Sequence, residues 1–365
     1  MGSSKTSTRV SMKVLIEKEV VLELEYGTMP GPPDDIKIAE LESIEHEGNI
    51  SVQKMRFTFI PRNDRPDISF GMNVTMFHPD PAHVERAKQR IPAFGNNGLP
   101  CVIYVGGNLC PELLESGYIV INFQNDQLDP MEMGKPVIGP ARAAYQRLEP
   151  GMYTWGSISA WAWGGIRMVD YASICPEINK DQLIITGHSR NGKTALLAGA
   201  VDDRIAIVNP AGSGCGGAGS YIVLDEGSED IAALTDTRRW WAWMHPDFAT
   251  FGYNEERLFF DQHFLMGLVA PRPLLRTEGI LDTWANPRGT AAAFLATDEI
   301  YKFHGVPDRN QLALRAGGHT QNHEDMMALL SVANWHFFGV PQEHVFKDLA
   351  CDPKEFPPFM DWRCP

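Results

Sequence analysis

The feature of this sequence that most limits its fold is a series of short apolar runs, each closed by turn-forming residues. Such runs are typical of parallel strands that are buried on both faces of a sheet. Segments with the length and spacing of helices lie between several of them. Because strand and helix alternate, the sequence predicts an α/β fold in which helices cover a mostly parallel sheet. The expected strands are 100–107, 118–123, 182–187, 204–210, 272–277 and 311–316, and the expected helices are 156–172, 190–201, 287–303 and 322–338.

The N-terminal part of the chain has a different pattern. Residues 12–80 are expected to be β-rich, because KMRFTFIP and FGMNVTMF alternate apolar and polar residues as half-buried strands do. We therefore expect residues 1–97 to form a β-rich extension packed on a catalytic domain at 98–365. Within that domain, 212–262 is too long for a simple connection and is interpreted as a functional insert.

Composition excludes several classes of function. The chain of 365 residues has a net charge of −14, which argues against binding to nucleic acids. No apolar run reaches the roughly 20 residues that span a bilayer, and the polar N-terminus does not have the pattern of a secretory signal. The histidine and cysteine spacings indicate no metal site, and no cofactor motif is present. Cys351 and Cys364 are either bridged or free thiols.

A strand-to-helix turn at 186–196, TGHSRNGKTAL, carries the strongest chemical signal. A serine at such a turn is held on a tight bend with its hydroxyl exposed, as in the nucleophile elbow of hydrolases. Gly187 relieves the crowding of this bend, but Asn191 breaks the strict G-x-S-x-G pattern. Taken alone, Ser189 fits a helix N-cap as well as it fits a nucleophile.

The order of two later segments favours the nucleophile. A hydrolase of this type needs an acid after a later strand and a histidine after the last strand. Glu278 and Asp282 follow one such strand, and His319 follows the last. We expect Ser189, His319 and Asp282 to form a catalytic triad, with Glu278 as the alternative acid. His319 is preferred to His323 because the two glycines before it suit a loop that approaches closely.

These motifs resemble the glucuronoyl esterases, carbohydrate esterase family 15. The family motif G-x-S-R-x-G-K is matched at 187–193, and the similarity continues through FDQHFLMGLVAPRPLL at 260–275, DTWANPRG at 282–289 and GGH at 317–319. The resemblance implies an α/β-hydrolase fold, with a mostly parallel sheet in a three-layer αβα sandwich. It also implies hydrolysis of the ester between 4-O-methyl-glucuronic acid branches of xylan and lignin alcohols. Family members are usually secreted, although the compartment of this chain is left open.

The resemblance also implies roles for two cations next to the nucleophile. Arg190 would stabilise the oxyanion, because it places a permanent positive charge where negative charge develops. Lys193 would donate hydrogen bonds to sugar hydroxyls. Two cations in the first turn of a helix oppose its dipole, which favours a functional role over ordinary surface charge.

The chain departs from the family pattern at several positions. Many members place the catalytic acid where this chain has Gly212, whereas others use the aspartate that corresponds to Asp282. Fungal members typically carry a disulfide-bonded cysteine where this chain has His188, so that bridge is expected to be absent. For the uronate-binding residues of the insert, the resemblance implies counterparts at Glu229 and at Trp240 or Trp241. The tryptophan-rich stretch is either core or a platform for sugar stacking.

The sequence therefore predicts a serine carboxylic ester hydrolase that acts on a small-molecule or glycan ester. Two alternatives stay open at this point. One is a carboxylesterase or lactonase acting on an acid other than a uronate, and the other is a non-catalytic carbohydrate-binding homologue.

Overall fold

One mixed sheet organises the molecule. The computed structural model describes residues 19–356 except 46–49, 136, 240–241 and 350. Within these residues, nine strands form a single sheet in the order β1-β2-β3-β5-β4-β6-β7-β8-β9. The strands are β1 Asp35–Glu45, β2 Ser51–Ile60, β3 Phe70–His78, β4 Leu99–Val105, β5 Ile119–Phe123, β6 Ile178–His188, β7 Ile207–Ala211, β8 Leu274–Gly279 and β9 Asn310–Arg315.

The six strands from β4 to β9 all run parallel. Each expected strand of the α/β region overlaps one of them, so the predicted parallel sheet is confirmed. Parallel strands point their carboxyl ends toward the same edge of a sheet, where ligands and catalytic groups usually lie. Segments that leave β6, β7, β8 and β9 therefore start from one common edge.

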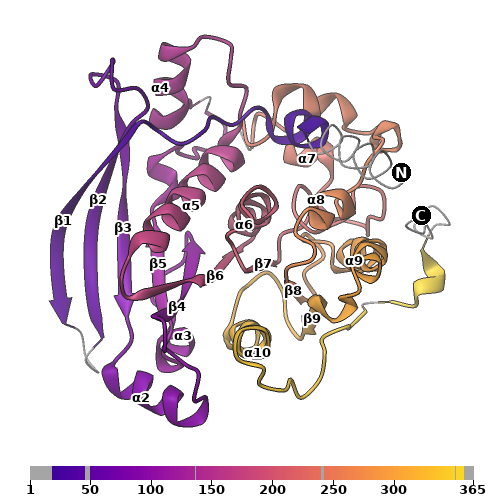
Figure 1. Ribbon diagram of the computed structural model, residues 1–365. Helices are drawn as coiled ribbons and strands as arrows, with labels where there is room; N and C mark the ends of the chain where they lie inside the picture. Colours follow the sequence, from indigo (N-terminus) through magenta and orange to yellow (C-terminus); the bar gives the residue numbers. More distant parts are fainter. Residues whose placement is uncertain (1–18, 46–49, 136, 240–241, 350, 357–365) are drawn as a thin grey trace, which may run out of the picture.

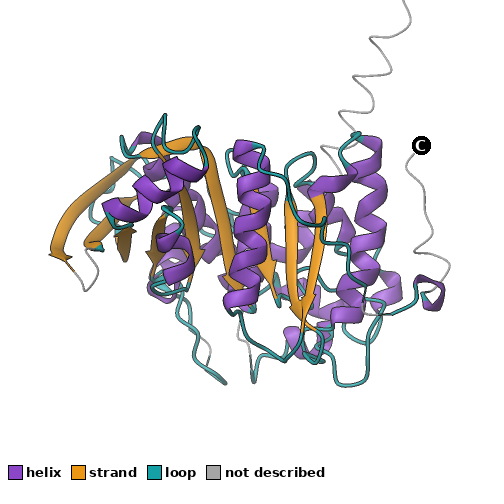
Figure 2. Cartoon of the chain, turned by 90° about the horizontal axis from the view of Figure 1, so that it is seen from below, coloured by secondary structure: helices purple, strands orange, loops and turns teal. Residues whose placement is uncertain are grey.

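Helices cover both faces of this sheet (Figures 1 and 2). Alternate residues of each central strand belong to different cores: Ile103 and Ile185 to one, Val102 and Ile184 to the other. Successive side chains point to opposite faces of the sheet, and both faces are buried. For this reason the parallel strands appear in the sequence as continuous apolar runs. One face carries α4 Pro140–Leu148, α5 Ser157–Ile174, α6 Arg190–Val201, α8 His263–Gly267 and α9 Pro287–Phe303; the other carries α2 Pro81–Arg90, α3 Pro111–Glu115 and α10 His323–Phe338.

The N-terminal region is β-rich as expected over β1, β2 and β3, which pair antiparallel. β3 also pairs antiparallel with β5, so these strands continue the main sheet. Residues 19–26, which lie within the segment expected to be β-rich, are helical. The side chains of Val21, Glu25 and Tyr26 are buried there, and their i, i+4 and i+5 spacing is that of one helix face. The boundary between an extension and a catalytic domain at residue 97 stays a prediction.

The expected insert at 212–262 contains little regular structure among its described residues. It holds the four-residue helix α7 Ile231–Leu234 and the 3-10 turns Pro246–Phe251 and Glu255–Arg257. The other short 3-10 turns lie at Asn125–Gln127, Pro307–Arg309 and Pro353–Glu355. None of the described helices has both the length and the apolar character that a membrane crossing requires. Cys351 is a free thiol, and Cys364 lies outside the described residues.

Close packing of α6 on the sheet provides a test of this fold. A Cβ atom at Gly199 of α6 would lie 2.3 Å from a methyl group of Val208 on β7. We expect Gly199→Ala to lower the free energy of unfolding by about 1–3 kcal/mol, because overpacking outweighs the gain in helix propensity. Urea unfolding followed by circular dichroism measures this change. Gly31→Ala is the control, because no atom lies within 4 Å of the added methyl group. A variant at 199 as stable as the original chain would contradict the packing.

Candidate active site

Ser189 occupies a strained turn between β6 and α6. Its backbone angles are φ 61° and ψ −126°, a conformation that residues other than glycine rarely adopt. The turn is stabilised by a hydrogen bond from the amide of Ser189 to the carbonyl of Ala211 on β7, at 2.9 Å. A Cβ atom at Gly187 would lie 2.4 Å from the carbonyl oxygen of Asn191, so this bend requires a glycine there. The Ser189 side chain makes no N-cap hydrogen bond.

His319 connects Ser189 to Asp282. Its Nε2 atom lies 2.9 Å from Oγ of Ser189, and its Nδ1 atom lies 2.6 Å from Oδ2 of Asp282. Asp282 is buried and also accepts a hydrogen bond from the amide of Ala285 at 3.2 Å. The three side chains expected to form a triad are therefore brought together in the geometry that nucleophilic catalysis needs.

The two alternative residues, Glu278 and His323, do not contact Ser189 or His319 in the hydrogen-bonded chain. Glu278 is fully buried and accepts a hydrogen bond from Thr290 at 3.3 Å rather than from His319. Burial, and then the charge of Asp282, raise the pKa of Glu278 well above its usual value. His323 is the first residue of α10, where its exposed ring pairs with Glu112 at 2.9 Å.

His188 fills the space beside the acid. Its ring centroid lies 4.5 Å from that of His319. A Cβ atom at Gly212 would lie 3.0 Å from Nε2 of His188 and 3.6 Å from Oδ2 of Asp282. An acidic side chain at position 212 would therefore collide with the His188 ring. Burial, and then the proximity of His319, lower the pKa of His188 to about 4, so this ring is neutral at neutral pH.

Arg190 and His319 line the same small cavity. The cavity has a volume of about 250 Å³ and is also lined by Ser189. The Arg190 guanidinium lies over the ring of Trp161, 5.8 Å from its centroid. None of the described carboxylates forms an ion pair with Arg190, so its charge can act on an anion in the cavity.

Lys193 and Glu229 also line this cavity, but they bind each other. The Lys193 ammonium donates to Oε2 of Glu229 at 2.7 Å and to the carbonyl oxygens of Ser213, at 2.8 Å, and Cys215. An ammonium has three donors, and all three are used here. A sugar hydroxyl would have to replace one of these partners. The bonding of Lys193 to sugar hydroxyls, which the resemblance implies, stays a prediction. Trp240 and Trp241 lie outside the described residues.

Two aromatic residues of the cavity were not assigned a role from the sequence. Trp243 and Trp284 line the cavity, and Arg239 lies over the ring of Trp284 at 4.7 Å. Trp284 follows Asp282 by two positions in the DTWANPRG motif. This closeness in sequence to the expected catalytic acid could have indicated that Trp284 lies at the site. Across the described residues, no three His, Cys, Asp or Glu side chains are grouped as metal ligands would be.

The burial of two histidines, His188 beside the catalytic acid and His336 on α10, can be tested through the pH dependence of stability. Burial lowers the pKa of both His188 and His336 from 6.5 to about 4, with His319 adding to the effect at His188 and Arg309 at His336. Between these pH values the unfolded chain binds protons that the folded chain does not, so stability falls as the pH falls from 6.5 toward 4.

After allowance for solvent screening, we expect His188→Gln and His336→Gln each to reduce the loss of stability between pH 7 and pH 4.5 by about 1–2 kcal/mol. Urea unfolding at the two pH values measures the loss. His304→Gln, which alters an exposed side chain, is the control. An unchanged pH dependence in the first two variants would show that the rings are more accessible than described.

Comparison with known proteins identifies a family with the same arrangement. A family model described as "Glucuronyl esterase, fungi" matches residues 81–305, which is more than half of the chain. A 4-O-methyl-glucuronoyl methylesterase from Neurospora crassa is 29% identical over 310 residues, which cover 83% of this chain and 70% of that protein.

Solved structures agree with this match. A carbohydrate esterase family 15 glucuronoyl esterase from Caldicellulosiruptor kristjansonii has a TM-score of 0.75 at 28% identity, covering 95% of this chain and 91% of that one. A glucuronoyl esterase from Sporotrichum thermophile, in complex with methyl 4-O-methyl-β-D-glucopyranuronate, has a TM-score of 0.68 at 25% identity, covering 90% and 83%. The family resemblance of the motifs is thus confirmed: the chain belongs to the glucuronoyl esterases of carbohydrate esterase family 15, which have the α/β-hydrolase fold.

Proposed function

We propose that this chain is a serine esterase that hydrolyses esters of glucuronic acid and of its 4-O-methyl derivative. The observation that carries the proposal is the continuous hydrogen-bonded chain from Asp282 through His319 to Ser189. It is supported by family membership and by the substrates named for the relatives.

In the first half of the reaction, Oγ of Ser189 attacks the carbonyl carbon of the ester. His319 accepts the hydroxyl proton at Nε2, and the Asp282 carboxylate stabilises the imidazolium through Nδ1. The tetrahedral intermediate then collapses. The C–O bond to the alcohol breaks, and His319 returns the proton to the departing oxygen.

In the second half, water enters the site that the alcohol has left. His319 removes a proton from the water as it attacks the acyl carbon, and a second tetrahedral intermediate forms. Breaking of the bond to Ser189 Oγ releases the acid, and the proton passes from His319 to that oxygen. The side chain of Asp282 keeps the imidazole tautomer in which Nε2 can accept a proton during both steps.

The oxyanion of both intermediates has two sources of stabilisation. The first amides of α6 have no acceptor within the helix, and they lie next to Ser189 at the positive end of the helix dipole. Arg190, which lines the cavity without an ion-pair partner among the described carboxylates, adds a full positive charge. Donors that are already in place when charge develops lower the barrier without reorganisation.

The cavity fits a polar ring with an apolar face. Trp243 and Trp284 contribute aromatic surface, and Glu229 contributes a carboxylate that can accept from sugar hydroxyls. Lys193 holds Glu229 and the carbonyl of Ser213 in place, so we assign it a supporting role at the wall of this cavity.

Removal of the nucleophile tests the mechanism. We expect Ser189→Ala to lower kcat on benzyl glucuronate by at least about 1,000-fold, because no other group can form the acyl-enzyme. Product release is followed by liquid chromatography, and circular dichroism checks the fold. Ser173→Ala on α5 is the matched control, because that hydroxyl donates to the carbonyl of Val169 in its own helix at 2.7 Å. Undiminished hydrolysis by the first variant would rule out the mechanism.

Glu229 tests recognition of the acid. We expect Glu229→Gln to raise KM for benzyl glucuronate by about 10-fold, because a charge-assisted hydrogen bond to the sugar is lost. Turnover of 4-nitrophenyl acetate, which has no hydroxyl groups on its acid, should stay within about twofold. An equal loss on both substrates would indicate that Glu229 serves only to hold Lys193.

The same pair of substrates separates the alternative functions in the unmodified protein. Turnover of the glucuronate ester supports uronate specificity. Turnover of the acetate ester alone would indicate a general carboxylesterase, and turnover of neither would indicate a binding role.

A further inference from the structure

One buried arginine holds the loop that carries His319. Arg315 is the last residue of β9, and its guanidinium donates to the main-chain oxygens of Ala316 at 3.0 Å, Gly318 at 3.5 Å and Thr320. It also donates to Oγ1 of Thr320 at 3.2 Å. These acceptors lie on both sides of His319 in the chain. The planar guanidinium has its donors in a fixed geometry, so it defines the relative positions of these carbonyls.

The loop has little rigidity of its own. Two glycines precede His319, and Gly317 has φ +101°, which residues with a side chain rarely adopt. The segment between β9 and α10 has no regular secondary structure. Its other anchors include the bond from the amide of Leu281 to the carbonyl of Gly317, at 3.0 Å. The side chain of Gln321 also anchors it, because it donates to Thr186 at 3.1 Å and accepts from the hydroxyl of Tyr104 at 2.9 Å. Arg315 is the group that binds directly on both sides of the histidine.

The charge of Arg315 is compensated by Asp325. Nε of Arg315 donates to Oδ2 of Asp325 at 2.8 Å, and both side chains are almost fully buried. The same oxygen accepts from the amide of Asn322 at 2.8 Å and so closes the capping box of α10. The pair therefore ties the end of β9 to the start of α10, with His319 in the chain between them.

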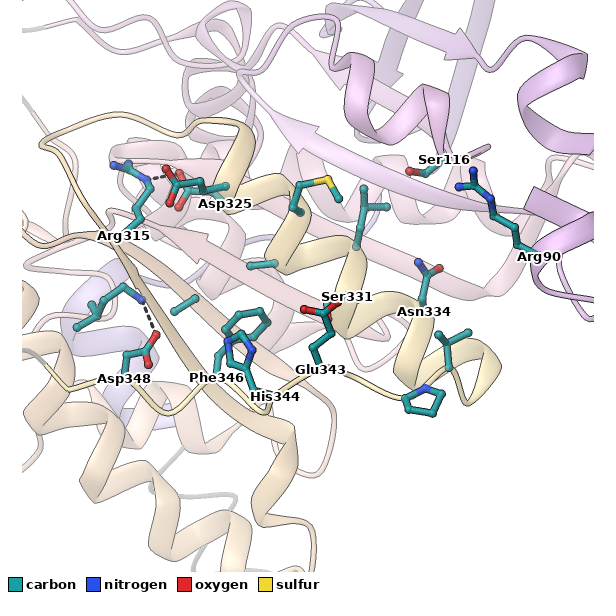
Figure 3. A pocket seen from close by; sticks show the side chains of 18 residues that line it. Arg90, Ser116, Arg315, Asp325, Ser331, Asn334, Glu343, His344, Phe346 and Asp348 are labelled. Carbon is teal, nitrogen blue, oxygen red and sulfur yellow. Dashed lines mark hydrogen bonds and ion pairs between the residues drawn. The ribbon is translucent and has the colours of Figure 1, made fainter. Parts of the chain in front are cut away.

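The pair lines a second cavity and is not among the residues that line the substrate cavity. Figure 3 shows Arg315 and Asp325 joined at one end of this second cavity, of about 610 Å³, which runs along α10. His319 is not among the residues that line it. The guanidinium thus acts on the histidine through the loop backbone and through its charge, and not by contact with substrate.

We propose that Arg315 is the positioning residue for the catalytic histidine. Its hydrogen bonds hold the loop so that His319 stays within bonding distance of Ser189. The Asp325 carboxylate cancels its positive charge, which would otherwise disfavour the imidazolium that forms during the reaction. The inference rests on the proposed role of His319 as the proton-transfer group.

Conservative replacement tests the hydrogen bonds. A lysine keeps the charge but cannot bind several carbonyls in a fixed plane, so we expect Arg315→Lys to lower kcat on benzyl glucuronate by about 100-fold. KM should change by less than about threefold, because no substrate contact is removed.

Arg272→Lys is the matched control. The Arg272 guanidinium also binds main-chain carbonyls, which are those of Asp202, Ile205, Gly199 and Leu268. Arg272 precedes β8, so it lies at the end of the parallel strands opposite to the active site. A similar loss of thermal stability in both variants, with loss of kcat only at 315, supports the proposal. Loss of kcat in proportion to stability at both sites would overturn it.

The pH dependence of kcat/KM tests whether the charges of Arg315 and Asp325 act on the protonation of His319. Asp325→Asn leaves the Arg315 cation without its counter-charge, so the acid limb should move to lower pH. Arg315→Met leaves the carboxylate alone and should move the limb to higher pH. The double variant Arg315→Met/Asp325→Asn should restore the position of the limb but not kcat, which separates the two roles.

The variants keep the other charged or titratable side chains that the structure describes near His319. Asp282 and His188 contact its ring, Glu278 is buried near Asp282, and Arg190 lines the same cavity. The charge of Arg315 also contributes to the lowered pKa of His188. Full activity of Arg315→Lys, or an acid limb that does not move in either single variant, would overturn the inference while leaving the proposed function intact. No ester hydrolysis by the unmodified chain would overturn both.

Discussion

The hydrogen bond between His319 and Ser189 joins two residues that are 130 positions apart, and the rest of the site depends on it. The bond is possible because β6 and β9 are parallel members of one sheet, so the segments that follow them start at the same edge. The strained backbone of Ser189 then directs its hydroxyl toward that edge, and the cores on both faces of the sheet stabilise the turn. Strain at a functional residue is tolerated where the surrounding structure is rigid.

Two buried cations hold the loops at the edge of the sheet where the active site lies. Lys193 binds the carbonyl oxygens of Ser213 and Cys215, and Arg315 binds three carbonyl oxygens around His319. Each cation is paired with a buried carboxylate, Glu229 in one case and Asp325 in the other. Irregular backbone near a core needs such partners, because unpaired carbonyl groups are costly to bury. The pairing also keeps the net charge near the reacting groups small.

The catalytic acid follows β8 rather than β7, and the ring of His188 explains why. Asp282 reaches His319 from the loop after β8, while the space above Gly212, after β7, is occupied by the neutral ring of His188. A charged ring at 188 would oppose protonation of His319 at 4.5 Å, whereas a buried neutral ring does not. The identity of residue 188 and the position of the catalytic acid therefore depend on each other, because the His188 ring occupies the space that an acidic side chain at position 212 would need.

The sequence by itself determined the parallel sheet and the order in which a nucleophile, an acid and a histidine follow its strands. It offered Ser189 and His319 as two of these residues and left the acid open between Asp282 and Glu278. These follow from local signals: apolar runs, glycines at tight turns and the order of polar groups after strands. The helix at 19–26 was missed, because its β-branched and apolar residues satisfy a strand pattern as well as a helical face. Only the tertiary structure decided between Asp282 and Glu278, showed that Lys193 is committed to Glu229, and brought Arg315 around the His319 loop. Those outcomes depend on distances between segments far apart in the chain, and such distances are set by how the helices and loops pack on the sheet.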